Sequence, residues 1–267
     1  MAMQEILVTG ANGQIGTWLR QSLRQPNRVL RLLDVGHQPA LEPDELGELI
    51  TASVTDLDAM VRACQGVSAV VHLGGHSTGG FSWAQYLDVN VNGTYCVLEA
   101  ARRAGVPRVV YASSHHAVGF YAAPSDEKAP DYLFPRPDTL YGASKAAGES
   151  LCSLYHDRHG IDVVCLRIGS YRPKPGDARA LWNWLSPGDC TRLFEAAIAC
   201  PEPGYRVVWG VSANSRRKMS LEEANAIGYF PQDDAEDFAN EIPVEAKIGR
   251  RDSRELLGGP YTESTFE

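Results

Sequence analysis

Tyr141 and Lys145 stand four positions apart in the stretch YGASK, a spacing that places both side chains on one face of a helix. A free tyrosine has a pKa of about 10 and is a poor base at neutral pH. A fixed ammonium group nearby favours the phenolate and lowers that pKa toward the working range. The pair therefore predicts a base that accepts a proton from a substrate hydroxyl, although the spacing by itself is more common in surface helices without such a role.

A second stretch with reactive residue types is SSHHAV, residues 113–118. A serine hydrolase needs a nucleophile elbow such as G-x-S-x-G, and neither serine lies in one. Adjacent histidines on an extended segment point to opposite sides, so His115 and His116 are not expected to chelate a metal, and no metal site is predicted. We interpret both as pocket residues that donate to substrate oxygens; the alternative is one histidine in the core and one in solvent.

Three glycines follow an apolar run in ILVTGANGQIGTWL, at Gly10, Gly13 and Gly16. Glycines at a helix start let the backbone approach a pyrophosphate, which the helix N–H groups and dipole stabilise. Asp34 ends the next apolar run, 18 positions after Gly16, where an acid bonds an adenosine ribose. A carboxylate there repels a 2′-phosphate, so NAD is predicted rather than NADP. Asp56 either orients the adenine or caps a helix.

Apolar runs rich in β-branched residues alternate with helical patterns along much of the chain. The predicted strands are Ile6–Thr9, Val29–Leu33, Ala69–Leu73, Arg108–Ser113 and Asp162–Ile168, with a weaker one at Leu49–Ser53. The predicted helices are Ile15–Leu23, Leu57–Cys64, Ala84–Ala104 and Tyr141–His159. The alternation predicts an α/β fold: a Rossmann-type doubly wound parallel sheet, as an NAD-binding domain over residues 1–168. Residues 169–267 are predicted to form a small C-terminal substrate-binding lobe packed on it, with helices near Asp189–Ala199, Leu221–Ala226 and Ala235–Glu241 and a strand at 206–210.

The composition limits the partners that the chain can have. A net charge of -8 provides no basic field for a phosphate backbone, so no nucleic acid is expected. No stretch reaches the roughly 18 to 20 apolar residues that span a membrane. The start, MAMQEILVTG, lacks the pattern of a secretion signal, and the six scattered cysteines have no zinc spacing and are interpreted as reduced packing residues. We therefore expect a cytoplasmic protein.

The order of these motifs resembles the extended branch of the short-chain dehydrogenases/reductases, over about residues 4–170. The motifs are the glycine turn, Asp34, the stretch NVNGT, a serine that closes the fifth strand, and Y-x-x-x-K. The resemblance implies that Tyr141 is the catalytic base, that Lys145 also bonds the nicotinamide ribose, and that Ser114 bonds the reacting oxygen. Ser114, rather than Ser113, has the family's spacing to Gly119. Besides the residues above, the implied cofactor-binding positions are Gln14, Ile15, Leu57, Leu73, Gly74, Gly75, Asn90, Ile168 and Tyr171.

In finer detail the chain is similar to the bacterial uronate dehydrogenases, in VVHLGGHS, VVYASSHHAVGFY, PDTLYGASKAAGE, LRIGSYRPKPGDAR and WLSPGD. Such enzymes oxidise the anomeric C1 hydroxyl of D-glucuronate or D-galacturonate with NAD and release an aldarolactone, so this activity is expected here. The resemblance places Arg179 on the substrate carboxylate, where a guanidinium fits better than an ammonium. It places the remaining substrate contacts at Ser77, Ser114, His115, His116 and Ser170. Two positions depart from the pattern, His115 in place of an asparagine and Tyr171 in place of a smaller residue, so the preferred uronate stays open.

Two other interpretations stay open. An NDP-sugar epimerase or reductase would use the same tyrosine and lysine, although the chain after Ile168 is short for a domain that grips a nucleotide. A non-catalytic NAD-binding sensor would share the sheet, although such proteins often lack both catalytic residues. In relatives the helices at Ala84–Ala104 and Tyr141–His159 often pair across a two-fold axis, so a homo-oligomer is expected.

Overall fold

A computed structural model describes residues 3–77, 80–124, 127–242 and 256–263 of the chain. Its main sheet has seven strands in the order β3-β2-β1-β4-β5-β6-β9. These strands are β1 (Gln4–Thr9), β2 (Arg28–Asp34), β3 (Gly47–Thr51), β4 (Ala69–His72), β5 (Arg108–Ser114), β6 (Asp162–Ile168) and β9 (Tyr205–Gly210). β1 pairs in parallel with β2 and β4, β2 with β3, and β4 with β5. The sheet is Rossmann-like, and the predicted α/β fold is confirmed.

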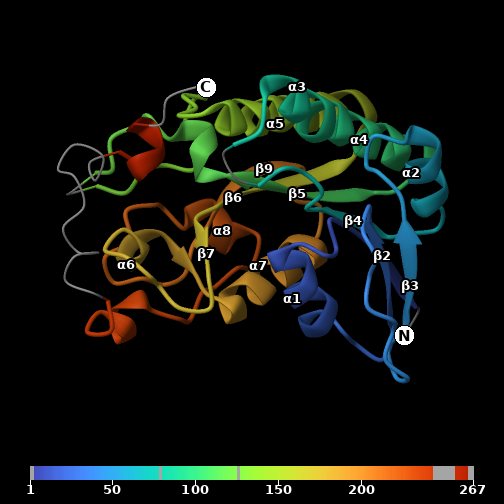
Figure 1. Cartoon of the computed structure of the whole chain (residues 1–267), viewed down its shortest axis with the longest axis horizontal. Helices are drawn as coiled ribbons and strands as arrows, with labels where there is room; N and C mark the ends of the chain where they lie inside the picture. Colours follow the sequence, from blue (N-terminus) through green and yellow to red (C-terminus); the bar gives the residue numbers. More distant parts are fainter. Residues whose placement is uncertain (1–2, 78–79, 125–126, 243–255, 264–267) are drawn as a thin grey trace. The chain divides into compact units, whose positions relative to one another are not determined.

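The helices that connect the first strands lie on both faces of the sheet. α1 (Gln14–Ser22) joins β1 to β2, and α2 (Leu57–Ala63) joins β3 to β4. The chain moves outward from β1 in the first case and returns past it in the second, so right-handed crossovers put the two helices on opposite faces. Figure 1 shows α1 on one face, with α2 and α4 (Gly93–Ala104) on the other.

Burial explains which strands the sequence marks clearly. Ile6, Leu7 and Val8 in β1 are completely buried, as expected for a central parallel strand covered on both faces. The weakly marked strand is present as β3, but it is an edge strand with no fully buried residue. An edge strand keeps polar residues, which is why its pattern is faint.

The predicted helix at Ala84–Ala104 consists of three consecutive pieces. α3 (Trp83–Gln85) starts at a capping box, in which Ser82 and Gln85 bond each other's backbone N–H groups. A π-helical segment, η1 (Tyr86–Asn92), follows and passes directly into α4. The wider π turn changes the helical phase, which a pattern of three- and four-residue spacings does not register.

The structure divides into two compact units. The first contains Met1–Ala112, Ala147–Cys165 and Pro201–Arg206, and the second contains Ser113–Ala146, Leu166–Cys200 and Val207–Glu267. β9, which the pattern assigned to the C-terminal lobe, is instead the edge strand of the main sheet. The predicted boundary at residue 168 stays a prediction.

The second unit also contains a small two-stranded parallel sheet and several short helices. Ser170–Tyr171 (β7) pairs with Trp184–Leu185 (β8), in a region where the sequence indicated only loop. The helical segments are η2 (His115–Val118), the first turns of α5 (Leu140–His159), α6 (Ala180–Asn183), α7 (Pro187–Ala199), α8 (Glu222–Ala226), η3 (Ala235–Phe238) and η5 (Gly259–Glu263). A buried cluster that includes Val118, Trp209 and Leu257 forms part of its core.

Within the described ranges, the helices are all too short or too polar to cross a membrane. The six cysteines are free, and all but Cys200 are buried, so they pack as predicted.

Candidate functional site

The turn between β1 and α1 requires glycine at two positions. Gly10 has a φ of +70°, and a side chain there would come within 2.8 Å of the backbone nitrogen of Gly74. A side chain at Gly16 would overlap the carbonyl oxygen of Gly10. α1 begins after Gly13, which has no side chain to cap the helix, and its first turn carries no acidic residue. The backbone N–H groups at this helix start therefore suit an anion such as a pyrophosphate.

The structure brings Asp34 to this glycine turn. Its Oδ2 accepts the backbone N–H of Asn12 at 2.9 Å, and its Oδ1 accepts the N–H of Gly36 at 3.3 Å. The N–H of Ala11 also bonds the carbonyl oxygen of Leu33, which ties the turn to the end of β2. A carboxylate in this place fits the ribose of an adenine dinucleotide.

A directed chain of hydrogen bonds fixes the loop after β4. The N–H of Gly74 donates to Thr9 Oγ1 (3.1 Å), which bonds His72 Nδ1 (2.8 Å). His72 Nε2 lies 3.1 Å from Thr94 Oγ1, and that hydroxyl donates to the Asn90 carbonyl (2.5 Å). Because a carbonyl only accepts, His72 carries its proton on Nε2 and accepts from Thr9. Sequence reasoning missed this chain, because its members are spread over three separate stretches, at residues 9, 72–74 and 90–94.

Two of the predicted cofactor positions have structural bonds of their own. The Asn90 amide accepts the N–H of His76 (2.7 Å) and donates to the carbonyl of His76 (3.0 Å), so it clamps the same loop. Asp56 caps α2 by accepting the N–H of Ala59 at 3.0 Å, directly before Leu57. Their contacts to a cofactor stay predictions. The other predicted positions of this unit are Gln14 and Ile15 at the start of α1 and Leu73 and Gly75 after β4.

Ser114, the predicted catalytic serine, and the two histidines follow one another in the second unit. Ser114 Oγ accepts the N–H of His116 at 3.2 Å and so caps η2. We predicted that His115 and His116 lie on an extended segment and point apart, and this was wrong. Successive side chains of a 3₁₀ helix are about 120° apart rather than opposed, and the two rings lie 3.9 Å apart between centroids. Both are buried, 4% and 7% exposed, so the alternative with one in solvent is excluded.

Both ring nitrogens of His115 are bonded. Nδ1 lies 2.9 Å from the carbonyl oxygen of Ile168, and Nε2 lies 2.6 Å from Nη2 of Arg179. A carbonyl only accepts and a guanidinium only donates, so the ring is neutral with its proton on Nδ1. Burial, with smaller effects from His116 and Arg179, lowers the pKa of His115 well below its usual value of 6.5. His115 therefore does not titrate near neutral pH.

Arg179 is a desolvated cation rather than a solvated loop residue. Its Nη2 also donates to the carbonyl of Leu257 (2.6 Å), its guanidinium lies 5.4 Å from the centre of a Trp182 ring, and its Nε is buried with no hydrogen-bond partner. Burial lowers the pKa of Arg179. In the part of the chain that the structure describes, no carboxylate forms an ion pair with it. A partly buried guanidinium of this kind suits an anionic ligand.

Tyr141 and Lys145 lie on the first turns of α5. Both are nearly buried, 9% and 5% exposed, and Lys145 Nζ lies 5.8 Å from the centre of the Tyr141 ring. Thr139 Oγ1 accepts the N–H of Gly142 (2.9 Å) and so fixes the first turn of the helix. The interpretation of the pair as exposed surface residues is therefore excluded.

Sequence reasoning missed Asp138 and Tyr261, which both contact His116. Asp138 Oδ2 lies 2.7 Å from His116 Nδ1, and the His116 ring lies 4.6 Å from Tyr261 and 5.9 Å from Tyr141 between centroids. Asp138 stands directly before the cap residue Thr139, which is a local signal for a helix start. No local pattern links it to a histidine 22 positions away.

Three predicted substrate or cofactor positions, Ser77, Ser170 and Tyr171, form no hydrogen bond with His115, His116, Tyr141 or Arg179 among the described residues. Ser170 and Tyr171 form β7 and are half-buried, and within the described residues the Ser170 hydroxyl has no hydrogen-bond partner. Ser77 belongs to the first unit and is exposed. Their roles stay predictions.

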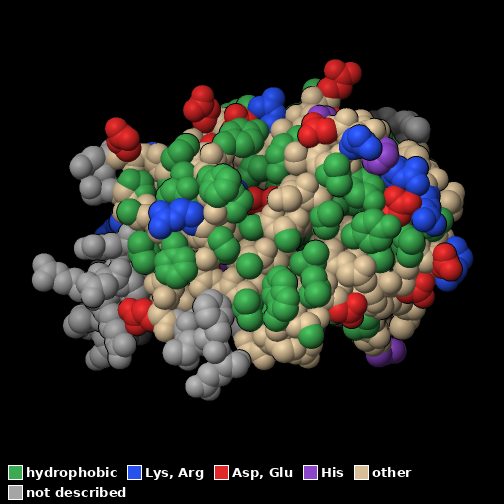
Figure 2. All heavy atoms as spheres, turned by 90° about the horizontal axis from the view of Figure 1, so that it is seen from above, with side chains coloured by type: hydrophobic (Ala, Val, Ile, Leu, Met, Phe, Trp, Pro, Cys, Tyr) green, Lys and Arg blue, Asp and Glu red, His purple; other side chains and the backbone are tan. Residues whose placement is uncertain are grey.

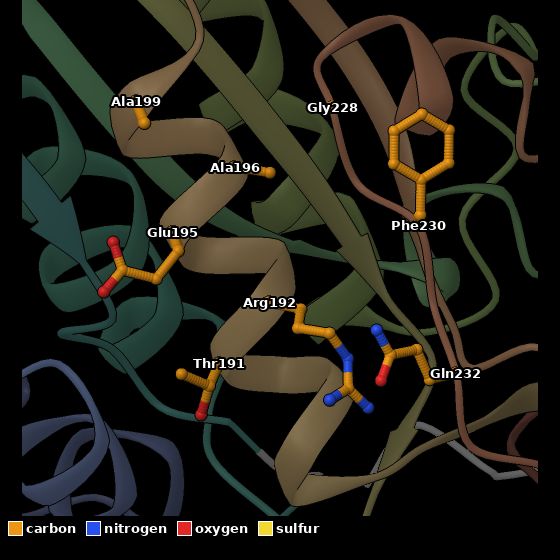
Figure 3. A pocket seen from close by; sticks show the side chains of 8 residues that line it. All are labelled: Thr191, Arg192, Glu195, Ala196, Ala199, Gly228, Phe230 and Gln232. Carbon is orange, nitrogen blue, oxygen red and sulfur yellow. The ribbon is translucent and has the colours of Figure 1, made fainter.

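A hollow of about 440 Å³ on the second unit involves none of the predicted residues. α7 lines one side with Thr191, Arg192, Glu195, Ala196 and Ala199, and Gly228, Phe230 and Gln232 line the other (Figure 3). Arg192 is neutralised by Asp189 and Asp233, each 2.7 Å away. Because the Arg192 charge is already paired and none of the predicted site residues lines it, the hollow is not a candidate active site.

A dinucleotide turn on a Rossmann-like sheet and a buried Ser-Tyr-Lys set define a class of NAD-dependent enzymes. Residues 6–187 match the model of the NAD dependent epimerase/dehydratase family, and the chain belongs to this family.

Individual relatives narrow the comparison. The uronate dehydrogenase of Pseudomonas syringae pv. tomato is 39% identical over 241 residues, 90% of this chain and 86% of the relative. The NAD-dependent glucose-6-phosphate dehydrogenase of Haloferax volcanii is 38% identical, over 89% of this chain and 97% of the relative. A solved mutant of the uronate dehydrogenase of Agrobacterium tumefaciens, complexed with NAD, has a TM-score of 0.91 and 34% identity, covering 99% of this chain and 98% of that chain.

Substitution of His115 by asparagine is expected to reduce the acid sensitivity of the fold. Below the usual histidine pKa of 6.5 the unfolded chain binds a proton at His115 that the folded chain does not bind. The free energy of unfolding of the wild type therefore decreases as the pH is lowered below 6.5. His115 contributes up to about 1.4 kcal/mol per pH unit to this decrease. Denaturant unfolding of both proteins between about pH 7 and about pH 5 measures the difference. Parallel loss of stability in the two proteins would show that His115 is protonated in the folded state.

Proposed function

We propose that this chain is an NAD-dependent dehydrogenase that oxidises the anomeric C1 hydroxyl of a hexuronate, D-glucuronate or D-galacturonate, to the aldarolactone. The observation that carries the proposal is the half-buried Arg179, whose Nε is buried and which has no carboxylate partner among the described residues. It is connected through the rings of His115 and His116 to Tyr141. A cation held in this way favours a substrate that brings its own anion to a site with a base. Uronate dehydrogenases are among the relatives of this chain.

The reaction removes a hydride and a proton from the same carbon–oxygen unit. Tyr141, as phenolate, takes the proton of the C1 hydroxyl, and the positive Lys145 stabilises the phenolate. Ser114 Oγ accepts a backbone N–H and keeps its own proton for the reacting oxygen, which it holds in place. When bound, NAD accepts the hydride from C1. The C1 hydroxyl of a hemiacetal is more acidic than an ordinary alcohol, which makes the proton transfer easier.

The first unit fits NAD. The close approach of Gly10 to Gly74 leaves a side-chain-free surface, and the uncapped start of α1 offers N–H groups to the pyrophosphate. Asp34, with Oδ2 on the glycine turn and Oδ1 on the N–H of Gly36, would bond the ribose hydroxyls and repel a 2′-phosphate. Asp56, Leu57, Asn90, Ile168 and Tyr171 are proposed as further contacts.

The sugar is held by one cation and several hydrogen-bonding groups. Arg179 binds the carboxylate, and His115 acts through Arg179 because both of its nitrogens are bonded. Ser77, Ser170 and His116 are proposed to bond hydroxyls. A sugar phosphate would also satisfy the Arg179 cation, and a relative of that specificity exists, so the substrate test includes glucose 6-phosphate.

We also propose a homo-oligomer in the cytoplasm. Four large hydrophobic side chains are exposed along α3, η1, α4 and α5, at Trp83 (44%), Leu87 (46%), Tyr95 (40%) and Leu154 (51%). Figure 2 views the molecule from the side of these helices and shows hydrophobic side chains at the surface between charged ones. Such a surface suits a two-fold contact between copies. The six free cysteines fit a reducing compartment.

Absorbance of NADH, after the protein is mixed with NAD and each sugar, tests the function. We expect turnover with glucuronate or galacturonate, and little with glucose 6-phosphate or UDP-glucuronate. In Tyr141→Phe, kcat should fall about 10²- to 10⁴-fold, because the base is lost while the ring is kept.

The control for this variant is NAD affinity, measured by titration of protein fluorescence, which should stay unchanged. Full turnover without the Tyr141 hydroxyl would refute its role as base, and loss of NAD binding would make it a structural residue. Activity on UDP-glucuronate instead would support the epimerase or reductase alternative, and NAD binding without turnover of any sugar would support the sensor.

Arg179→Ala should raise the KM for the uronate about a hundredfold, because the substrate carboxylate loses a buried charge partner. The matched neutral aldose, glucose or galactose, serves as a control for general damage to the site, since it has no carboxylate. The ratio of kcat/KM for uronate over aldose should therefore collapse in the variant. An unchanged ratio would exclude the carboxylate clamp.

Light scattering during size-exclusion chromatography should show a dimer or larger assembly. Leu154→Glu should shift it toward the monomer, because a charge replaces an apolar contact on α5. Leu46→Glu is the matched control, since Leu46 is similarly exposed (46%, against 51% for Leu154) but lies outside these helices. A monomeric wild type, or equal dissociation by both variants, would contradict the proposed contact.

A further inference from the structure

We propose that Asp138 is a positioning residue for substrate recognition: it holds the proton of His116 on Nδ1, so that Nε2 accepts a hydrogen bond from one hydroxyl of the sugar. The inference rests on the proposed function, in which His116 contacts the uronate. The inference adds Asp138 to the site, beyond the serine, tyrosine and lysine, and it specifies that His116 accepts the hydrogen bond from the sugar rather than donating it.

Asp138 is held rigidly. Its side chain is completely buried, and its backbone N–H bonds the carbonyl of His116 at 3.3 Å. A side chain at either Gly119 or Gly258 would overlap its carboxylate, so the carboxylate is enclosed by backbone. Its Oδ1 accepts the hydroxyl of Thr139 (3.1 Å), which itself accepts the N–H of Gly142. Oδ2 is thereby directed at His116.

The His116 ring is fixed from several sides. The His115 ring lies 3.9 Å away, the Tyr261 ring 4.6 Å away and the Tyr141 ring 5.9 Å away, measured between centroids. Nδ1 is taken by Asp138 at 2.7 Å. Among the residues that the structure describes, none bonds Nε2, and that nitrogen is not sealed from solvent, so it is available to a ligand.

The chemistry of the pair sets the direction of the ligand contact. An ionised carboxylate has no proton to donate, so the proton in the bond belongs to Nδ1. In a neutral ring Nε2 then has a lone pair and no proton. It accepts from a group that can donate, such as a sugar hydroxyl, and it disfavours a group that only accepts, such as fluorine.

Asp138→Asn should reverse this arrangement without changing its shape. The hydroxyl of Thr139 already accepts the N–H of Gly142 and has a proton to donate, so it favours the amide oxygen at the place of Oδ1. The amide nitrogen of the new asparagine therefore faces His116 Nδ1 and donates to it. The ring moves its proton to Nε2, which becomes a donor toward the sugar.

Two-bond ¹H–¹⁵N spectra of histidine-labelled protein test the tautomer directly, with His116→Gln used to assign the signals. We expect a proton on Nδ1 in the wild type and on Nε2 in Asp138→Asn. A doubly protonated His116 in the wild type, or the same tautomer in both proteins, would overturn the inference. This readout does not depend on turnover, so it stands whether or not the proposed function does.

Kinetics test the consequence for recognition. In Asp138→Asn the KM for the uronate should rise about tenfold or more, because a donor now meets a donor, while the KM for NAD stays unchanged. In a His116→Ala background the same change should alter the KM by less than about twofold, because Asp138 acts through His116. Equal effects in both backgrounds would mean that Asp138 only supports the fold.

A panel of monofluorinated uronates tests the direction of the hydrogen bond. The fluorinated uronate with the highest KM in the wild type should have a less elevated KM in Asp138→Asn. An unchanged order of KM values would overturn the role in recognition.

Discussion

In the second unit, Arg179 carries a positive charge that is largely removed from water. A guanidinium removed from water is costly unless it is bonded. Within the described residues, the Arg179 guanidinium is bonded only through Nη2, to His115 Nε2 and the carbonyl of Leu257. Both partners are neutral acceptors, which orient the cation without cancelling its charge. The charge is therefore left for a ligand. His115 can accept from Arg179 only while it is neutral, which burial ensures.

In the first unit the proposed ligand contacts are made mainly by backbone N–H groups rather than by charged side chains. In the proposed site a dinucleotide would be bonded by N–H groups at a helix start, and the side chains would mainly position the loops around it. Asp34 ties the glycine turn to β2, and Asn90 clamps the backbone of His76 after β4. The proposed catalytic residues of the second unit are instead side chains whose protons must be in defined places. Backbone binding at a turn produces a local sequence pattern, whereas the positioning of side-chain protons depends on residues that are distant in the sequence.

This difference between local patterns and long-range contacts explains which parts of the fold and of the site could be predicted from the sequence. The glycine turn and the Tyr141 and Lys145 pair are local patterns, set by the geometry of one turn or one helix, and both were found where expected. The contact of Asp138 with His116 depends on how distant segments pack, and so does the bond of Arg179 to Leu257, 78 positions away. The error at His115 and His116 was local, because a strand continues into a 3₁₀ helix there without a glycine or proline to mark the change.

Three buried histidines show how the fold assigns protons through partners of fixed polarity. His115 donates from Nδ1 to a carbonyl, and His116 donates from Nδ1 to a carboxylate, so both present Nε2 as an acceptor. One acceptor is used inside the protein by Arg179, and the other is left for the ligand. His72 in the first unit has the opposite tautomer, because the hydroxyl of Thr94 beside its Nε2 is committed to a carbonyl. The tautomer of each ring is decided by a partner that can only accept a hydrogen bond, or whose own proton is already donated elsewhere. These partners, Ile168, Asp138 and Thr94, all lie at least 22 positions from the histidine in the sequence.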